Sequence, residues 1–148
     1  MATPSTFPAK TATSMSVAPW RDRTAMVLLL LAFAGAFISF LSGIGGSIAA
    51  SPATQMVEIW RTYGFGIFCG LFLLLAFFPR RYPGIWELAI LNKAALAVTG
   101  LILLGHDIQD ASTILFSDGT LALIIALAYI LTRGYSGWAT LIKTSQAK

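Results

Sequence analysis

The sequence predicts an all-α protein, a four-helix transmembrane bundle, and three observations support this prediction. First, hydrophobic residues make up 57% of the 148 residues and charged residues only 11%, whereas an ordinary soluble domain has about 25% charged residues. Second, the chain contains four apolar runs, and about 20 apolar residues in a helix cross a bilayer core. Third, the connections between these runs contain proline and polar residues, as is typical of turns outside the membrane. We therefore expect lipid to cover most of the chain.

A single membrane domain is expected at residues 23–140. Its four spans are predicted at residues 25–48, 60–78, 85–106 and 115–135. The strongly apolar part of the last run, residues 119–132, is short for a span. Either that helix continues through Tyr135 and Trp138 as interfacial residues, or residues 114–116 already lie in the membrane.

The two ends of the chain are predicted to be cytosolic tails. Residues 1–22 are rich in alanine, threonine, serine and proline without apolar periodicity, so we expect this tail to be flexible. Residues 141–148 form the second, shorter tail. Between the second and third spans, residues 79–83 form a tight turn, which predicts that these two spans are antiparallel neighbours.

Basic residues outside the spans predict the topology. Four spans place both termini on the same side, and most lysines and arginines fall on that side, with Arg61 alone opposite. The positive-inside rule then predicts an up-down-up-down bundle with both termini in the cytosol. The residues on the predicted cytosolic side are Lys10, Arg21, Arg23, Arg80, Arg81, Arg133, Lys143 and Lys148.

The third span carries polar residues within its apolar run. Asn92, Thr99 and His106 recur every seven residues, so they lie on one stripe of a helix. Lys93 lies about 100° around the helix from Asn92 and about 13 Å into the span. A lysine at such a depth costs about 3 kcal/mol to insert, so it should face protein or water. Glu87 lies a turn and a half nearer the cytosol and is too far along the helix to pair with Lys93.

Two main interpretations of these polar residues stay open. In the first, Glu87 lies at the cytosolic interface near Arg80 and Arg81, and Lys93 extends its stem toward the headgroups. In the second, Lys93 and Asn92 line a semi-polar cavity between helices, where a buried lysine can act as an acid, a base or an electrostatic anchor. A contact between copies of the chain is a third interpretation.

A second polar cluster is expected at the outer rim of the bundle. Arg61 begins the second span, His106 ends the third, and Asp118 is placed to cap the fourth helix. Either Arg61 pairs with an acid and locks the helix ends, or His106 and Asp118 exchange protons with a substrate. Together the two clusters give the candidate catalytic residues Lys93, Asn92, His106 and Asp118, and the candidate substrate-binding residues Glu87, Thr99, Arg61 and Tyr63.

Small residues in the first span predict a packing face. Gly35, Ser39, Ser42 and Gly43 recur at steps of three and four residues, so another backbone can approach one stripe of that helix. A groove that contacts a ligand is the alternative. The lone Cys69 excludes a disulfide framework within the chain and a cysteine metal cluster, and we expect no metal and no cofactor. The sequence has no basic patch interleaved with aromatic residues, so we do not expect it to bind nucleic acid.

Two short motifs carry a resemblance to a known family. An Arg-Thr-Tyr-Gly run opens the second span at Arg61, and an Asp-Gly pair at Asp118 opens the fourth. With the length and the four spans, these motifs make residues 25–133 resemble the small DoxX-like integral membrane proteins. The resemblance implies a membrane bundle. Some small bundles of this general kind act in lipid or specialised-metabolite pathways, which favours such a role by analogy.

Three functions are compatible with these patterns. The bundle can bind a hydrophobic small molecule between its helices and isomerise or cyclise it by acid/base chemistry. Alternatively, it is a non-catalytic accessory or scaffold subunit, with the first span docked on another membrane protein or a second copy. A proton-coupled transporter is the third possibility, but such transporters need an embedded carboxylate, and Glu87, near the interface, is the only one expected.

Overall fold

The structure, a computed structural model, describes residues 17–139 and residue 142, and these residues form helices and turns without any strand. The helices are α1 (Pro19–Ala49), α2 (Gln55–Phe77), α3 (Ile85–Leu103) and α4 (Ala111–Thr132). Each is long and apolar enough to cross a membrane. The predicted four-helix bundle of membrane-spanning type is therefore confirmed. The proposed tail segments 1–16 and 143–148, and residue 141, lie outside the described residues.

The helix bounds differ from the predicted spans at several ends. α1 begins at Pro19, inside the predicted tail, because proline is favoured in the first turn of a helix. α3 ends at Leu103, so His106 lies in the turn that follows. α4 begins at Ala111 and ends at Thr132, so residues 114–116 belong to this helix and Tyr135 lies after its end. Ser117 Oγ donates to Thr113 O over 2.6 Å, so this hydroxyl group is satisfied within α4.

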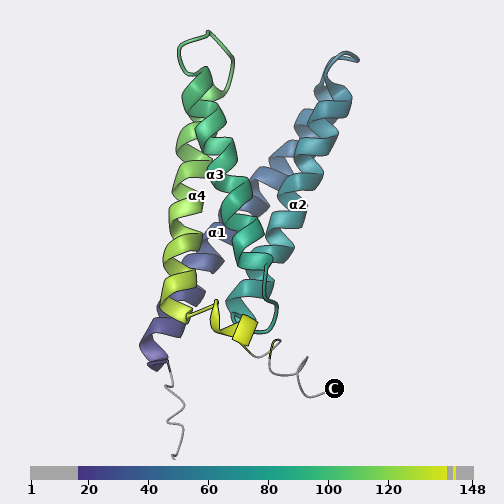
Figure 1. The fold of residues 1–148 in the computed structure, drawn as a ribbon. Helices are drawn as coiled ribbons and strands as arrows, with labels where there is room; N and C mark the ends of the chain where they lie inside the picture. Colours follow the sequence, from purple (N-terminus) through teal and green to yellow (C-terminus); the bar gives the residue numbers. More distant parts are fainter. Residues whose placement is uncertain (1–16, 140–141, 143–148) are drawn as a thin grey trace, which may run out of the picture.

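The helices run up-down-up-down (Figure 1). Most of the arginines belong to segments at one end of the molecule. We call it the basic end; it comprises the start of α1, the α2–α3 turn and the end of α4. Arg80 Nη2 lies 2.8 and 2.6 Å from the two carboxylate oxygens of Asp22, which ties the α2–α3 turn to α1. Arg21 Nη2 donates to Ile130 O over 2.9 Å and ties α1 to α4.

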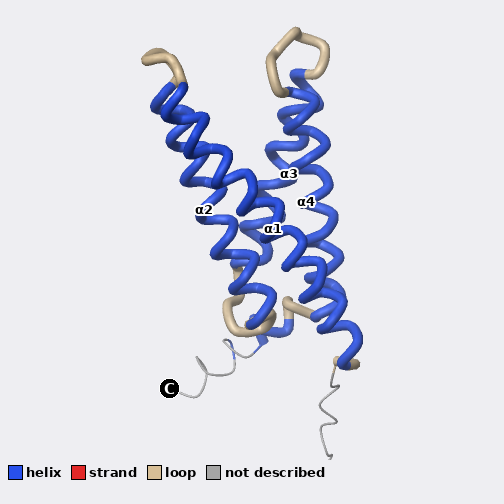
Figure 2. Tube along the Cα trace, turned by 180° about the vertical axis from the view of Figure 1, so that it is seen from behind, coloured by secondary structure: helices blue, strands red, loops and turns tan. Residues whose placement is uncertain are grey.

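The molecule is V-shaped, because two helical hairpins diverge away from the basic end (Figures 1 and 2). α1 packs along α2, α3 packs along α4, and α1 also contacts α4. α2 and α3 are antiparallel, as predicted, but they touch only slightly. We call the end with the α1–α2 and α3–α4 turns the open end.

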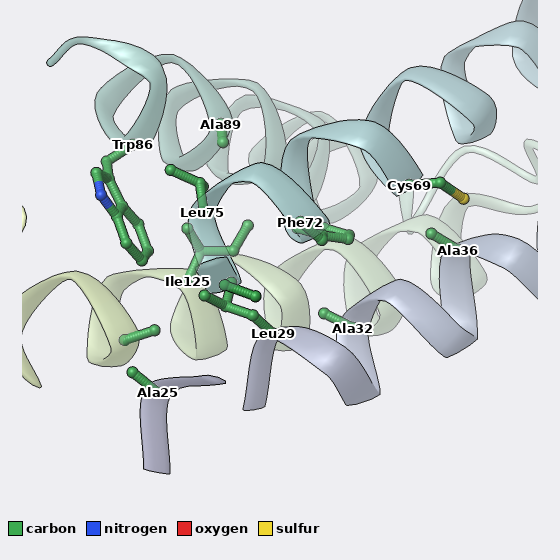
Figure 3. Packing of buried hydrophobic residues seen from close by; sticks show 12 residues of the cluster. Ala25, Leu29, Ala32, Ala36, Cys69, Phe72, Leu75, Trp86, Ala89 and Ile125 are labelled. Carbon is green, nitrogen blue, oxygen red and sulfur yellow. The ribbon is translucent and has the colours of Figure 1, made fainter. Parts of the chain in front are cut away.

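The hydrophobic core lies toward the basic end. Leu29, Leu75 and Ile125, from three different helices, point toward one another there (Figure 3). On α1 the buried residues follow steps of four and three, so one face of that helix meets the others. The core thus occupies the first half of α1 and α3 and the second half of α2 and α4. Its members are Ala25, Leu29, Ala32, Ala36, Cys69, Phe72, Leu75, Ala76, Trp86, Ala89, Ile125 and Ala128.

Toward the open end, the helices pack only in pairs and through small residues. Gly43 of α1 faces Thr62 of α2, and a Cβ on Gly43 would lie 2.6 Å from Thr62 Oγ1. In the other hairpin, a Cβ on Gly100 of α3 would lie 2.8 Å from Ala111 O and from Leu115 N. These glycines allow the backbones within each hairpin to approach closely.

Replacing Gly100 with alanine is expected to loosen the α3–α4 hairpin, because the new methyl group would overlap backbone atoms that cannot move aside. We expect Gly100→Ala to lower the free energy of unfolding by about 1–3 kcal/mol, measured by denaturant titration in detergent micelles. The matched control is Gly35→Ala, since a Cβ on Gly35 meets nothing within 4 Å among the described residues. Equal stability of the two variants would show that this close approach is not needed.

Candidate functional site

Lys93 and Asp118 form an ion pair inside the bundle. Lys93 Nζ donates to Asp118 Oδ1 over 2.7 Å, and their side chains are only 6% and 13% exposed. Lys93 therefore neither extends to the headgroups nor faces lipid, so the snorkelling interpretation is wrong. A lysine embedded in a membrane should face protein, and this lysine faces a carboxylate of the neighbouring helix.

The position of Asp118 corrects the sequence-based prediction. It lies seven residues into α4, or about 10 Å from the helix start, and so it is neither a helix cap nor a member of an outer rim. Asp110 occupies the position before the helix instead, with a left-handed backbone conformation. Both charges of the pair thus lie well inside helices that are long and apolar enough to cross a membrane.

Phe68 of α2 connects this ion pair to a groove on the surface. Lys93 Nζ lies 4.0 Å from the centroid of the Phe68 ring, a cation–π contact. The same phenylalanine lines a groove of about 480 Å³ between α2 and α3. The groove therefore has a buried ammonium group directly behind one of its walls. Its lining residues are Phe68, Leu71, Leu88, Ala89, Leu91, Asn92 and Ala95.

The predicted polar stripe of α3 faces outward rather than into a closed interior. Asn92 and Thr99 are both exposed. Asn92 lines the groove, where it supplies the polar side chain among otherwise apolar neighbours. Thr99 Oγ1 donates to Ala95 O over 2.9 Å, so its hydroxyl is satisfied by its own helix. Lys93 lies about 100° around the helix from Asn92, and its side chain points into the protein.

Glu87 belongs to a separate cluster at the basic end. Its Oε1 accepts hydrogen bonds from Tyr129 Oη at 2.6 Å and from Trp138 Nε1 at 2.9 Å. Its Oε2 is buried and has no partner among the described residues. Glu87 thus binds neither Arg80 nor Arg81 and does not reach the groove. It holds the segment after α4 against the start of α3.

The remaining predicted residues lie toward the open end and do not join Lys93. Arg61 forms an ion pair with Glu58 one turn away and reaches Asp110 with a separation of 3.6 Å, which links α2 to the start of α4. This agrees with the structural interpretation of Arg61. Tyr63 is 65% exposed. His106 is exposed in the turn after α3, whereas Asp118 binds Lys93, so the two do not form the acid/base pair of the alternative interpretation.

The small-residue stripe of α1 packs only in part within the described chain. Gly43 contacts Thr62, but a methyl group added to Gly35 would meet no described atom within 4 Å, and Ser42 is exposed. The buried face of α1 is made instead by Ala25, Leu29, Ala32 and Ala36. Alanine at three of those positions brings α1 close to its neighbours without glycine.

Sequence reasoning missed the aromatic residues that surround the polar groups. Phe68, Tyr129 and Trp138 lie in apolar or interfacial runs, where aromatic residues are common and carry no signal of their own. One signal was present, because an embedded lysine requires an embedded acid. Asp118 is close enough to the apolar run of the fourth span to have been recognised as that acid.

Comparisons with known proteins add no relative: no protein-family model matches the chain, and neither a curated protein nor a solved structure matches it. The DoxX-like resemblance therefore stays a prediction, and the site has to be understood from its own geometry.

Breaking the ion pair on one side is expected to destabilise the bundle strongly. Lys93→Met leaves the Asp118 carboxylate buried without a partner, which costs about 3–5 kcal/mol, whereas Lys93→Met combined with Asp118→Leu removes both charges and is expected to restore most of the loss. Unfolding in detergent micelles measures both effects. A double variant as unstable as the single one would mean that the two side chains do not interact.

Proposed function

We propose that this protein binds a hydrophobic small molecule in the groove between α2 and α3, and that Lys93 and Asp118 supply the acid and the base for its isomerisation or cyclisation. The bound molecule belongs to the class of lipid or specialised-metabolite intermediates, and it reaches the groove from the bilayer.

One observation carries the proposal: Phe68 is shared by the groove and the ion pair. Placing an ionisable residue inside a membrane costs free energy, so such a residue is taken by default to mark a functional site. Here the ion pair adjoins a groove whose volume, about 480 Å³, falls within the range of about 300–1,000 Å³ found for small-molecule sites.

The chemistry follows from the two partners of the pair. The Lys93 ammonium is a proton donor and the Asp118 carboxylate is a proton acceptor, so together they can protonate one position of a molecule and deprotonate another without a net change of charge. The ring of Phe68 covers the ammonium group. Rotation of this side chain upon binding would bring the ammonium group into contact with the ligand, while Asn92 holds a polar group of the ligand in place.

Filling the groove is expected to remove the ligand. Ala95→Phe places a large side chain in the groove lining, and we expect at least about a tenfold loss of any co-purifying hydrophobic molecule, which corresponds to about 1.4 kcal/mol of binding free energy. The measurement is solvent extraction and mass spectrometry of the protein purified in mild detergent. Ala34→Phe is the matched control, because Ala34 is an exposed alanine of α1 that does not line the groove.

The double variant Lys93→Met with Asp118→Leu separates binding from conversion. This variant keeps the groove, and it keeps the fold because no charge is left buried without a partner. It should therefore retain the ligand but leave it unconverted. An identical set of extracted molecules from the double variant and the unaltered protein would contradict the acid/base role while leaving the binding role intact. If Ala95→Phe retains all the molecules extracted from the unaltered protein, the binding role itself is contradicted.

The position of Asp118 gives specific support to one alternative, proton-coupled transport. The expectation that Glu87 is the only candidate carboxylate is wrong, because Asp118 lies well inside α4 and is paired with a cation, as in proton relays. If the protein transports protons, vesicles that contain it should dissipate an imposed pH gradient, as reported by an enclosed pH-sensitive dye. The double variant that lacks both charges should then be inactive. Equal rates in protein-containing and empty vesicles would exclude this alternative.

A further inference from the structure

We infer, on the basis of the proposed function, that the molecule bound between α2 and α3 is electrically neutral and carries a carbonyl or hydroxyl group on an otherwise apolar body. The charge balance of the site, the single amide in the groove lining and the depth of that amide all point to this class of ligand.

Charge balance argues against an acid or an amine. Lys93 and Asp118 neutralise each other over 2.7 Å, so neither charge is free to receive an opposite charge from a ligand. The residues that line the groove are all uncharged. A carboxylate or an ammonium group placed there would leave water without a counter-charge, which strongly disfavours binding.

Asn92 selects for a group that can form hydrogen bonds. Its side-chain amide has two donors and an acceptor, so it can donate to a carbonyl oxygen or exchange hydrogen bonds with a hydroxyl group. It is the polar member of the groove lining and is exposed there. In hydrocarbon, the amide gains most from a ligand that carries such a group, because water is scarce at that depth.

The depth of Asn92 excludes the headgroup of an ordinary phospholipid as its partner. Asn92 lies seven residues into α3, or about 10 Å along the helix from its start. Phospholipid headgroups stay at the interface, whereas a compact ketone, aldehyde or alcohol carries a small polar group that can lie within the hydrocarbon. Leu71, Leu88 and Leu91 contact the apolar body of such a molecule.

A set of photoreactive probes of equal chain length tests this inference. The probes are a long-chain alcohol, a methyl ketone, a carboxylic acid, an amine and an unsubstituted alkane, each with a diazirine in the chain. The purified full-length protein is reconstituted in phosphatidylcholine vesicles near neutral pH, irradiated and mapped by peptide mass spectrometry. We expect the alcohol and the ketone to label the groove residues at least about tenfold more than the acid and the amine.

Two variants make the result specific. Asn92→Leu should lower labelling by the alcohol and the ketone about tenfold and leave labelling by the alkane unchanged, because only the hydrogen bond is lost. Thr120→Val is the matched control, since Thr120 is an exposed polar residue of α4 outside the groove lining.

The outcomes separate this inference from the proposed function. Equal or stronger groove labelling by the acid or the amine would overturn the neutral class but not the binding role. Unchanged labelling of Asn92→Leu would overturn the part assigned to the amide. If Ala95→Phe is labelled by every probe as strongly as the unaltered protein, the groove is not a binding site, and both proposals fail.

Discussion

The ion pair between Lys93 and Asp118 is the constraint on which the arrangement of α3 and α4 depends. An ammonium group buried midway along an apolar helix requires a partner, and the partner here comes from the next helix along the chain. This pairing fixes the rotation of both helices about their axes, because Lys93 and Asp118 must face each other. Gly100 then lies against the backbone at Ala111 and Leu115, which permits the close approach of the two helices.

The bundle is divided along its length into two parts with different packing. At the basic end all four helices meet around Leu29, Leu75 and Ile125, and an ion pair ties the α2–α3 turn to α1. At the open end each hairpin packs only on itself, and the Arg61–Asp110 contact is half exposed and therefore contributes little. The groove lies beside the core, since Ala89 belongs to both, and the ion pair lies next to it on the side of the open end. If the ligand enters from the bilayer, as proposed, it reaches this groove without passing through the core.

The two acidic residues that lie within α3 and α4 have different surroundings. Glu87 is bound by Tyr129 and Trp138 and holds the segment after α4 at the basic end. Asp118 forms the ion pair with Lys93. One acid therefore has a structural role, and the other lies next to the proton donor of the proposed transfer, Lys93, which contacts Phe68 of the groove lining. Asn92 lies on the same helix as the lysine, about 100° away from it, and its side chain lines the groove.

By itself, the sequence determined the four apolar helices, their alternating direction and the presence of a lysine that must face protein, because hydropathy and the cost of burying charge are local properties of the chain. It also located Asn92 and Lys93 on adjacent stripes of α3. Only the tertiary structure decided which acid meets Lys93, that Phe68 joins the ion pair to a groove, and that His106 and Tyr63 stay apart from it. The physical reason is that helix rotation and the divergence of the hairpins arise from packing between residues far apart in sequence, such as Gly100 against Leu115, which no periodicity within one helix reveals.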